Sequence, residues 1–273
     1  MPAELGGQFI NYVEQDNIGQ YVANRIGRNS ISNYLFVNNG VYANTSDVPI
    51  DPVTGLRMRS EGNLTGYLGY LQSYQGGDAI LYDANGDYVI DYRDRQVTGN
   101  TQPLITGGFF NTFVYGQFSL NIAATFTAFR SIMNNALAYR MTQLSAPFDA
   151  ISVPAIDGDK MWRGPGDNRA TYANAYNYAH EAVMGNFRPE QTLWQENGSY
   201  LKINSATFSY SVPKKSAKRL GVNGIRTYVS SSNLWTISPY SGPNPESVTS
   251  LGKDLSGMYP NPRTYTLGLN VTF

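Results

Sequence analysis

The C-terminal residues 263–273 alternate between apolar and polar side chains along their whole length. The apolar positions are Tyr265, Leu267, Leu269, Val271 and Phe273. Small polar residues and a glycine occupy the positions between them. Because successive side chains of a strand point to opposite faces, the pattern predicts a strand with one apolar and one polar face. Its length suits a tilted strand that crosses a bilayer, and apolar-out, polar-in alternation is typical of outer-membrane β-barrels.

Residues 117–129 repeat this pattern in the middle of the chain, with apolar side chains at the even positions. Residues 107–115 are predicted to pair with them as a hairpin, because the connection Tyr115-Gly116-Gln117 is short enough for a tight turn. The facing of 107–115 stays open, since Phe109 and Phe110 lie on opposite parities. We expect lipid-facing side chains at Phe118, Leu120, Ile122, Phe126, Tyr265, Leu267, Leu269, Val271 and Phe273.

Four more segments are predicted as strands, namely 200–212, 225–235, 31–42 and 8–23. In the first, Phe208 and Tyr210 share the apolar parity, but Leu201 and Ile203 lie on the other one. A β-bulge explains such a change of phase, and a strand end that extends above the membrane is the alternative.

The predicted fold is therefore all-β, an antiparallel wall of transmembrane β-barrel strands with long external loops. If the chain ends at the periplasmic rim, the strand directions place 130–199 and 236–262 outside the cell. The turn 115–117 and the basic stretch 213–219 then lie in the periplasm. Short periplasmic turns and long external loops are usual in this class, so the count supports the barrel. We interpret 213–219 as a solvated turn at the membrane edge, with binding of anionic lipid or a partner as the alternative.

Composition excludes several other classes of protein. A net charge of zero and 15% charged residues exclude a nucleic-acid binder that depends on basic charge. No apolar run is long enough for a transmembrane helix. The chain has no cysteine, which excludes disulfides and cysteine-bound zinc. Met1-Pro2-Ala3-Glu4 lacks the features of a signal peptide, yet a barrel must be exported, so we expect 1–273 to be the C-terminal part of a longer precursor.

One motif has the spacing of a twelve-position calcium loop. Its predicted ligands are Asp83, Asn85, Asp87, the backbone carbonyl of Val89, Asp91 and Asp94. It departs from the pattern at position 6, where Tyr88 replaces the glycine of the sharp turn, and at position 12, where aspartate replaces the bidentate glutamate. The possible cofactor is Ca²⁺, and the alternative is an Asx-rich turn without metal.

No enzyme site is predicted. His180 is the only histidine and has no nucleophile motif near it, while Asp157-Gly158-Asp159 suits a turn. A glycoside hydrolase needs two facing carboxylates, and the sequence indicates no such pair. The main rival to a barrel is a soluble all-β carbohydrate-binding or adhesin module, in which apolar strand faces pack on each other.

Several short motifs follow one another in a fixed order along the chain. They are Asp83-Ala84-Asn85-Gly86-Asp87, Gly107-Gly108-Phe109, Tyr200-Leu201-Lys202-Ile203-Asn204, Tyr240-Ser241-Gly242, Tyr259-Pro260 and the segment from Pro262-Arg263 to Thr272-Phe273. Together these motifs resemble the C-terminal end of the SusC/RagA family of TonB-dependent receptors. The resemblance covers roughly 80–130 and 194–273.

The resemblance implies a large barrel in the outer membrane of a Gram-negative, Bacteroidetes-type bacterium that imports oligosaccharides or peptides. Its implied partners are a SusD-like surface lipoprotein as lid, TonB acting through a plug, and the rest of the barrel. By this resemblance, the plug and the N-terminal strands are not among these 273 residues. The 273 residues would supply part of the barrel wall and its external loops. Aromatic rings stack on sugars, so substrate contacts are expected at Trp162, Tyr172, Tyr176, Tyr178 and Trp194. The alternative for these residues is a role in the interface girdle and in loop packing.

Overall fold

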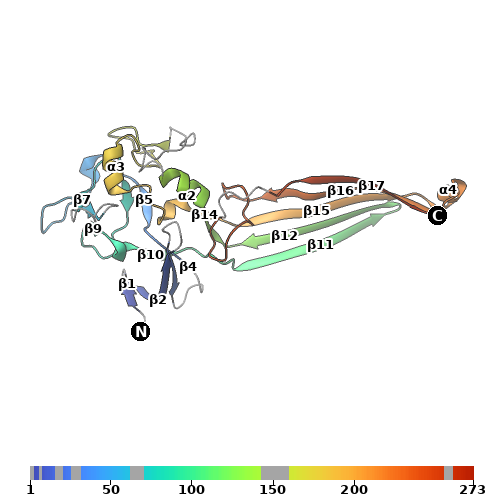
Figure 1. Cartoon of the computed structure of the whole chain (residues 1–273), viewed down its shortest axis with the longest axis horizontal. Coiled ribbons are helices and arrows are strands. Elements are labelled where there is room, and N and C mark those ends of the chain that lie inside the picture. Colours follow the sequence, from blue (N-terminus) through green and yellow to red (C-terminus); the bar gives the residue numbers. More distant parts are fainter. Residues whose placement is uncertain are drawn as a thin grey trace. The chain divides into compact units, whose positions relative to one another are not determined.

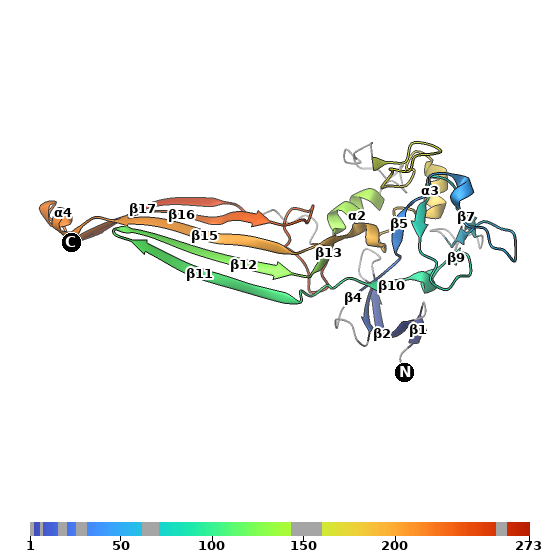
Figure 2. The same cartoon turned by 180° about the vertical axis from the view of Figure 1, so that it is seen from behind.

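The computed structural model describes residues 3–5, 8–15, 21–25, 32–61, 71–142, 160–254 and 261–273. The chain divides into two compact units. The sheet unit comprises 103–132, 196–247 and 257–273, and the mixed unit comprises 1–102, 133–195 and 248–256. Figures 1 and 2 show both from opposite sides.

The sheet unit is a five-stranded antiparallel sheet (Figure 1). Its strands, in sheet order, are β11 (Ile105–Tyr115), β12 (Phe118–Ala128), β15 (Tyr200–Ser211), β16 (Gly224–Ile237) and β17 (Thr264–Thr272). The five strands predicted from alternation are thereby confirmed. A short helix, α4 (Lys214–Arg219), connects β15 to β16 where the sequence predicts a basic turn. In the described part of the chain, the sheet is open and β11 and β17 are its edges.

The register places apolar and polar residues in separate rows across all five strands. One row of paired residues is Phe113, Leu120, Phe208, Val229 and Leu267. The adjacent row is Thr112, Asn121, Thr207, Ser230 and Thr266. Directly paired side chains lie on the same face, so the sheet has an apolar face and a polar face. The pairing also settles β11, because Phe109 and Phe113 join the apolar face while Phe110 and Val114 join the polar one.

A β-bulge accounts for the change of phase in β15. The pairing of β15 with both neighbours shifts between Ile203 and Ser205. On β16, the opposing Asn233 has the positive backbone φ of 52°. An extra residue in a strand reverses the facing of everything beyond it, and Leu201 and Ile203 therefore return to the apolar face. The bulge predicted as one of two explanations is confirmed.

The mixed unit contains the remaining sheets and helices. One sheet has the order β1 (Ala3–Leu5), β2 (Gln8–Gln15), β3 (Tyr21–Arg25), β4 (Ser32–Leu35) and β10 (Gln96–Thr98). The smaller ladders are β5 (Asn38–Val41) with β8 (Ala79–Leu81), and β7 (Gln72–Ser73) with β6 (Arg59–Ser60) and β9 (Val89–Ile90). The helices are α2 (Asn135–Thr142) and α3 (Tyr178–Met184), with 3-10 turns at Thr45–Asp47, Tyr92–Asp94 and Thr192–Trp194. The strands β13 (Ser131–Met133) and β14 (Gln195–Asn197) each include a boundary between the two units in the sequence, and they pair with each other.

Two strand predictions in this unit need correction. Residues 31–42 form two strands in different sheets, because the chain switches partners at Phe36, whose backbone bridges to Gln191. Residues 8–23 likewise give β2 and the start of β3, which pair with each other as a hairpin. The alternation of apolar and polar residues does not reveal a change of pairing partner, because the chain has an extended backbone in both strands of each predicted segment.

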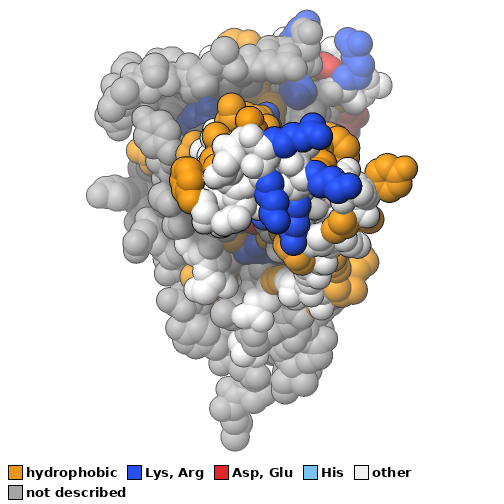
Figure 3. Space-filling view, turned by 90° about the vertical axis from the view of Figure 1, so that its right-hand side faces the viewer, with side chains coloured by type: hydrophobic (Ala, Val, Ile, Leu, Met, Phe, Trp, Pro, Cys, Tyr) orange, Lys and Arg blue, Asp and Glu red, His pale blue; other side chains and the backbone are white. Residues whose placement is uncertain are grey.

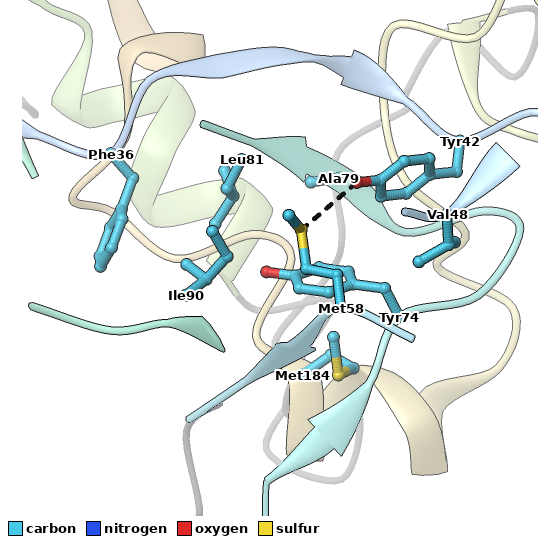
Figure 4. Packing of buried hydrophobic residues seen from close by; sticks show 9 residues of the cluster. All are labelled: Phe36, Tyr42, Val48, Met58, Tyr74, Ala79, Leu81, Ile90 and Met184. Atoms are coloured by element: carbon cyan, nitrogen blue, oxygen red, sulfur yellow. Dashed lines mark hydrogen bonds between the residues drawn. The ribbon is translucent and has the colours of Figure 1, made fainter. Parts of the chain in front are cut away.

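Buried side chains give the mixed unit its own core. One cluster, shown in Figure 4, consists of Phe36, Tyr42, Val48, Met58, Tyr74, Ala79, Leu81, Ile90 and Met184. Its two tyrosine rings lie 6.0 Å apart, and the hydroxyl of Tyr42 is 3.6 Å from the sulfur of Met58. A second cluster includes Met133, Met141, Phe187 and Trp194. Residues between 130 and 199 therefore contribute a packed core in addition to surface loops. No helix among the described residues is long and apolar enough to cross a bilayer.

Candidate functional site

The Asp83 loop between β8 and β9 is a series of Asx turns. Asp83 accepts hydrogen bonds from the backbone N–H of Gly86 at 2.7 Å and of Tyr88 at 2.9 Å. Asn85 and Asp87 each accept one from the residue two positions on, both at 2.9 Å. Tyr88 adopts a φ of 62°, the left-handed conformation that the calcium-loop pattern requires at this position. That conformation costs a non-glycine residue about 1 kcal/mol, which these hydrogen bonds offset.

The second half of the motif caps the 3-10 turn that follows it. Asp91 accepts from the N–H of Arg93 at 2.7 Å, and Asp94 accepts from the N–H of Asp91 and of Ala84, both at 2.8 Å. Asp94 is fully buried, and this burial raises the pKa of its carboxyl to about 6, although the two N–H donors lower it. Each carboxylate of the motif thus binds backbone of its own loop. Among the described residues, no group of three or more acidic or histidine side chains is arranged to hold a metal ion. Calcium binding stays a prediction.

Calcium titration tests this prediction. An extracellular-type site has a Kd of about 1 mM, so about 10 mM Ca²⁺ should raise the free energy of unfolding by about 1.4 kcal/mol. The shift is measured as the midpoint of chemical unfolding with and without Ca²⁺, with Mg²⁺ as the control cation. The double variant Asp83→Asn, Asp87→Asn keeps oxygen acceptors for the backbone but loses two charges, and should abolish the shift. An unchanged midpoint in the original chain would leave the Asx-turn alternative.

The aromatic residues predicted to contact substrate divide into buried and exposed ones. Trp194 is 0% exposed; its indole Nε1–H donates to the carbonyl of Arg188 at 2.9 Å, and its ring stacks on Tyr172 at 6.3 Å. Trp162 is also buried and donates to the carbonyl of Ala43 at 3.2 Å. Both tryptophan rings pack inside the mixed unit, and their contact with a solute stays a prediction. Tyr172 is half-buried and Tyr176 is 73% exposed, so Tyr176 keeps the prediction, while the side chain of Tyr178 lies outside the described residues.

His180 has a structural partner that the sequence did not indicate. Its Nε2 lies 2.9 Å from both carboxylate oxygens of Asp78, which is almost fully buried. Asp78 is held in place by the N–H of Gln75 at 2.8 Å and the amide of Asn186 at 2.9 Å. Burial lowers the pKa of His180, but the hydrogen bond and the charge of Asp78 raise it more, so the pKa is raised above its ordinary value of 6.5. The pair fastens α3 to the segment before β8.

The mixed unit is therefore expected to lose stability as the pH rises. A histidine whose pKa is raised on folding stabilises the folded state fully below pH 6.5, and this contribution disappears as the pH rises through the raised value. His180→Gln should remove the part of the dependence that lies above pH 6.5 and cost about 1.5 kcal/mol at low pH, the lower end for a hydrogen bond to a charged group. Unfolding midpoints across this pH range measure it. Parallel pH profiles for both proteins would contradict the expectation.

The polar face of the sheet carries groups that sequence reasoning missed. Ser119 and Ser209 hydrogen-bond across β12 and β15 at 2.6 Å, and Arg226 donates to the same Ser209 hydroxyl at 3.0 Å. Lys202 on β15 forms an ion pair with Glu246 of the segment after β16. The alternation identified the face, but the long-range ion pair has no local signal in the sequence.

The comparisons with known proteins relate this chain to TonB-dependent receptors. No protein-family model matches it. The TonB-dependent receptors P3 and P39 of Formosa agariphila are both 28% identical to it, over 212 and 206 residues. These alignments cover 72% and 73% of this chain but only 19% of each relative, so the chain spans about a fifth of the length of the curated relatives it matches.

Solved structures agree on the fold. The RagAB peptide importer in the open-open state covers 96% of this chain at 18% identity, with a TM-score of 0.53, and the chain covers 24% of it. The structure of the RagAB peptide transporter gives a TM-score of 0.52 at 19% identity, with the same coverage. The resemblance to TonB-dependent receptors and the all-β fold are confirmed. The relatives are receptors, not enzymes.

Proposed function

We propose that this chain is part of the β-barrel wall of a TonB-dependent importer in the outer membrane of a Gram-negative bacterium. The observation that carries the proposal is the separation of rows across the sheet. Leu267 on the apolar row is 81% exposed, and Phe113, Phe208 and Val229 of the same row are exposed as well. A continuous apolar surface of this kind is unfavourable in water and favourable against lipid. A soluble sandwich would bury these side chains against a second sheet.

One end of the sheet, with the turn 115–117 and helix α4, has the side chains expected at a membrane–water interface. Tyr115, Phe118, Tyr210 and Phe273 lie where β11, β12, β15 and β17 meet this end. Lys214, Lys215, Lys218 and Arg219 of α4 are all exposed there. Figure 3 looks onto this end and shows Lys and Arg side chains gathered beside hydrophobic ones. Aromatic rings next to cations are typical of the boundary between hydrocarbon and water.

The open edges of the sheet support completion by other strands. An unpaired strand edge exposes N–H and C=O groups, and lipid offers these groups no hydrogen bonds. In the proposed barrel, strands from the remainder of the receptor pair with β11 and β17. The relatives extend far beyond the matched region, which gives room for those strands and for a plug.

The solutes proposed for import are oligosaccharides or peptides, with a SusD-like surface lipoprotein as lid and TonB acting through the plug. The similar structures are named as peptide importers or transporters, which favours nutrient uptake. Tyr176 is largely exposed and is proposed to contact the solute. The wall and loops bind and guide the solute, and the parts beyond this chain move it.

Fractionation and co-purification test the proposal. The chain should partition with outer membranes, need detergent to stay in solution, and co-purify with an N-terminal receptor fragment that carries the plug and the remaining strands. A SusD-like lipoprotein should join that complex. A stable, detergent-free monomer would overturn the barrel-wall function and favour the soluble all-β binding module.

A further inference from the structure

The segment after β16 folds over the polar face of the sheet. Lys202 lies on this face, paired with Thr125 and Thr236, yet it is only 6% exposed. Its ammonium group forms an ion pair with Glu246. The side chain of Asn244 accepts a hydrogen bond from the N–H of Glu246 and donates one to the hydroxyl of Ser247, both at 3.0 Å. The covering segment is therefore a turn stabilised by its own hydrogen bonds. The segment around Glu246 therefore covers part of the polar face near Lys202.

A cavity of about 290 Å³ lies beneath this covering segment. Lys202, Arg263, Thr236 and the amides of Asn233, Asn244 and Asn261 line it, together with two prolines. This volume corresponds to about ten water molecules. It suits one sugar ring or one amino-acid residue of a longer solute. A lining of amides, a hydroxyl and two cations offers many hydrogen-bond donors and little apolar surface.

The side chains around the cavity carry an excess of positive charge, which favours the binding of an anion. Glu246 compensates Lys202, whereas Arg263 forms no ion pair with any residue that the structure describes. One positive charge is therefore left over at the cavity wall. The planar guanidinium group presents paired donors that match the two oxygens of a carboxylate.

The backbone next to Arg263 is held by Asn233 of β16, which lies opposite the bulge in β15. Asn233, in its left-handed conformation, donates its amide to the carbonyl of Pro262 at 3.0 Å. This bond ties the segment leading into β17 to the neighbouring strand. Arg263 therefore lines the cavity from a backbone that is anchored one residue away.

We propose that this cavity is a binding subsite for a carboxylate-bearing solute, held by Arg263 and the surrounding amides. The proposal rests on the proposed function, because in a barrel the polar face lines the path of the solute. It narrows the imported class to solutes with an acidic group, either an acidic sugar or an acidic peptide.

Binding to the purified 273-residue chain in detergent tests the subsite. The probes are glucuronate against glucose, and glycyl-glutamate against glycyl-glutamine, each followed by calorimetric titration. At least one acidic probe should bind more tightly than its neutral partner, with affinity falling as salt rises. The better-bound pair identifies the source of the carboxylate. Equal affinity within both pairs, or binding by neither acidic probe, would overturn the proposal.

Three variants locate the effect. Arg263→Gln, at an exposed position, should weaken the acidic probe about tenfold, the loss of one charge-assisted hydrogen bond. Arg219→Gln in α4 makes the same charge change at the opposite end of β16 and should leave affinity unchanged. Glu246→Gln releases the charge of Lys202 and should strengthen binding severalfold. An unchanged affinity in Arg263→Gln, or a weaker one in Glu246→Gln, would sink the subsite.

Failure of this proposal is separable from failure of the proposed function. Detergent dependence and membrane partitioning do not involve Arg263, so a chain that partitions with membranes but ignores carboxylates refutes only the subsite. A detergent-free monomer that still binds glucuronate through Arg263 refutes the barrel wall and leaves the subsite in place.

Discussion

Replacing Leu269 by arginine should destabilise the folded chain in lipid vesicles, because a cation on the lipid face costs up to about 2–4 kcal/mol at the bilayer midplane and less toward the interface. Leu269 lies near the middle of β17 and pairs with Thr227 on the apolar face. It is 62% exposed, so arginine meets no packed protein core that would reject it. Only the surrounding lipid supplies the penalty.

The matched control is Thr266→Arg, on the same strand and on the polar face. A cation there points to water and should change stability by less than about 0.5 kcal/mol. Denaturant unfolding of both variants in vesicles gives the two free energies. If Leu269→Arg costs as little as Thr266→Arg, the apolar face is wetted by water and the lipid assignment is wrong.

Trp194→Ala should lower the free energy of unfolding of the mixed unit by about 3–5 kcal/mol, the usual cost of removing a fully buried large aromatic side chain. The ring fills the second core cluster and stacks on Tyr172. Its indole N–H also satisfies the carbonyl of Arg188, whose guanidinium donates to the carbonyls of Met184 and Gly185 at the end of α3. Loss of the ring leaves a cavity and removes the contact that orients this arginine.

Tyr176→Ala is the matched comparison, because this ring is largely exposed and should contribute less than about 0.5 kcal/mol to stability. Chemical unfolding, followed by circular dichroism and by hydrogen exchange of α3, measures both variants. Trp194→Phe, which keeps a ring but loses the N–H donor, should fall between them. A near-native stability for Trp194→Ala would contradict a packing role for this ring and favour the predicted contact with a solute.

Local pattern predicted the strands because their two faces follow from backbone geometry alone. The alternation in 117–129 and 263–273 required no knowledge of neighbours, and β12 and β17 match it closely. The change of phase in the alternation at Leu201 and Ile203 is also visible in the local sequence, and it indicates the position of the bulge. The calcium-loop pattern counts Tyr88 as a departure because a glycine is usual there, yet Tyr88 adopts the left-handed conformation and its N–H donates to Asp83.

Partners distant in the sequence were not predictable. His180 and Asp78 are 102 residues apart, and Lys202 and Glu246 are 44 apart, so neither pair leaves a periodic trace. The division of 31–42 into β4 and β5 depends on Gln191, which bridges to Phe36 from another part of the chain. Burial separated Trp194 from Tyr176, although both are aromatic residues in one long connection.

The amino-acid pattern is sufficient to predict strands with an apolar and a polar face, because alternation along a strand is a property of the extended backbone. Which aromatic rings are buried, which charges are paired, and which part of the polar face is covered depend on how distant segments pack together. Such contacts form between segments far apart in the sequence, and the entropy cost of bringing these segments together must be met before the contact can stabilise the fold.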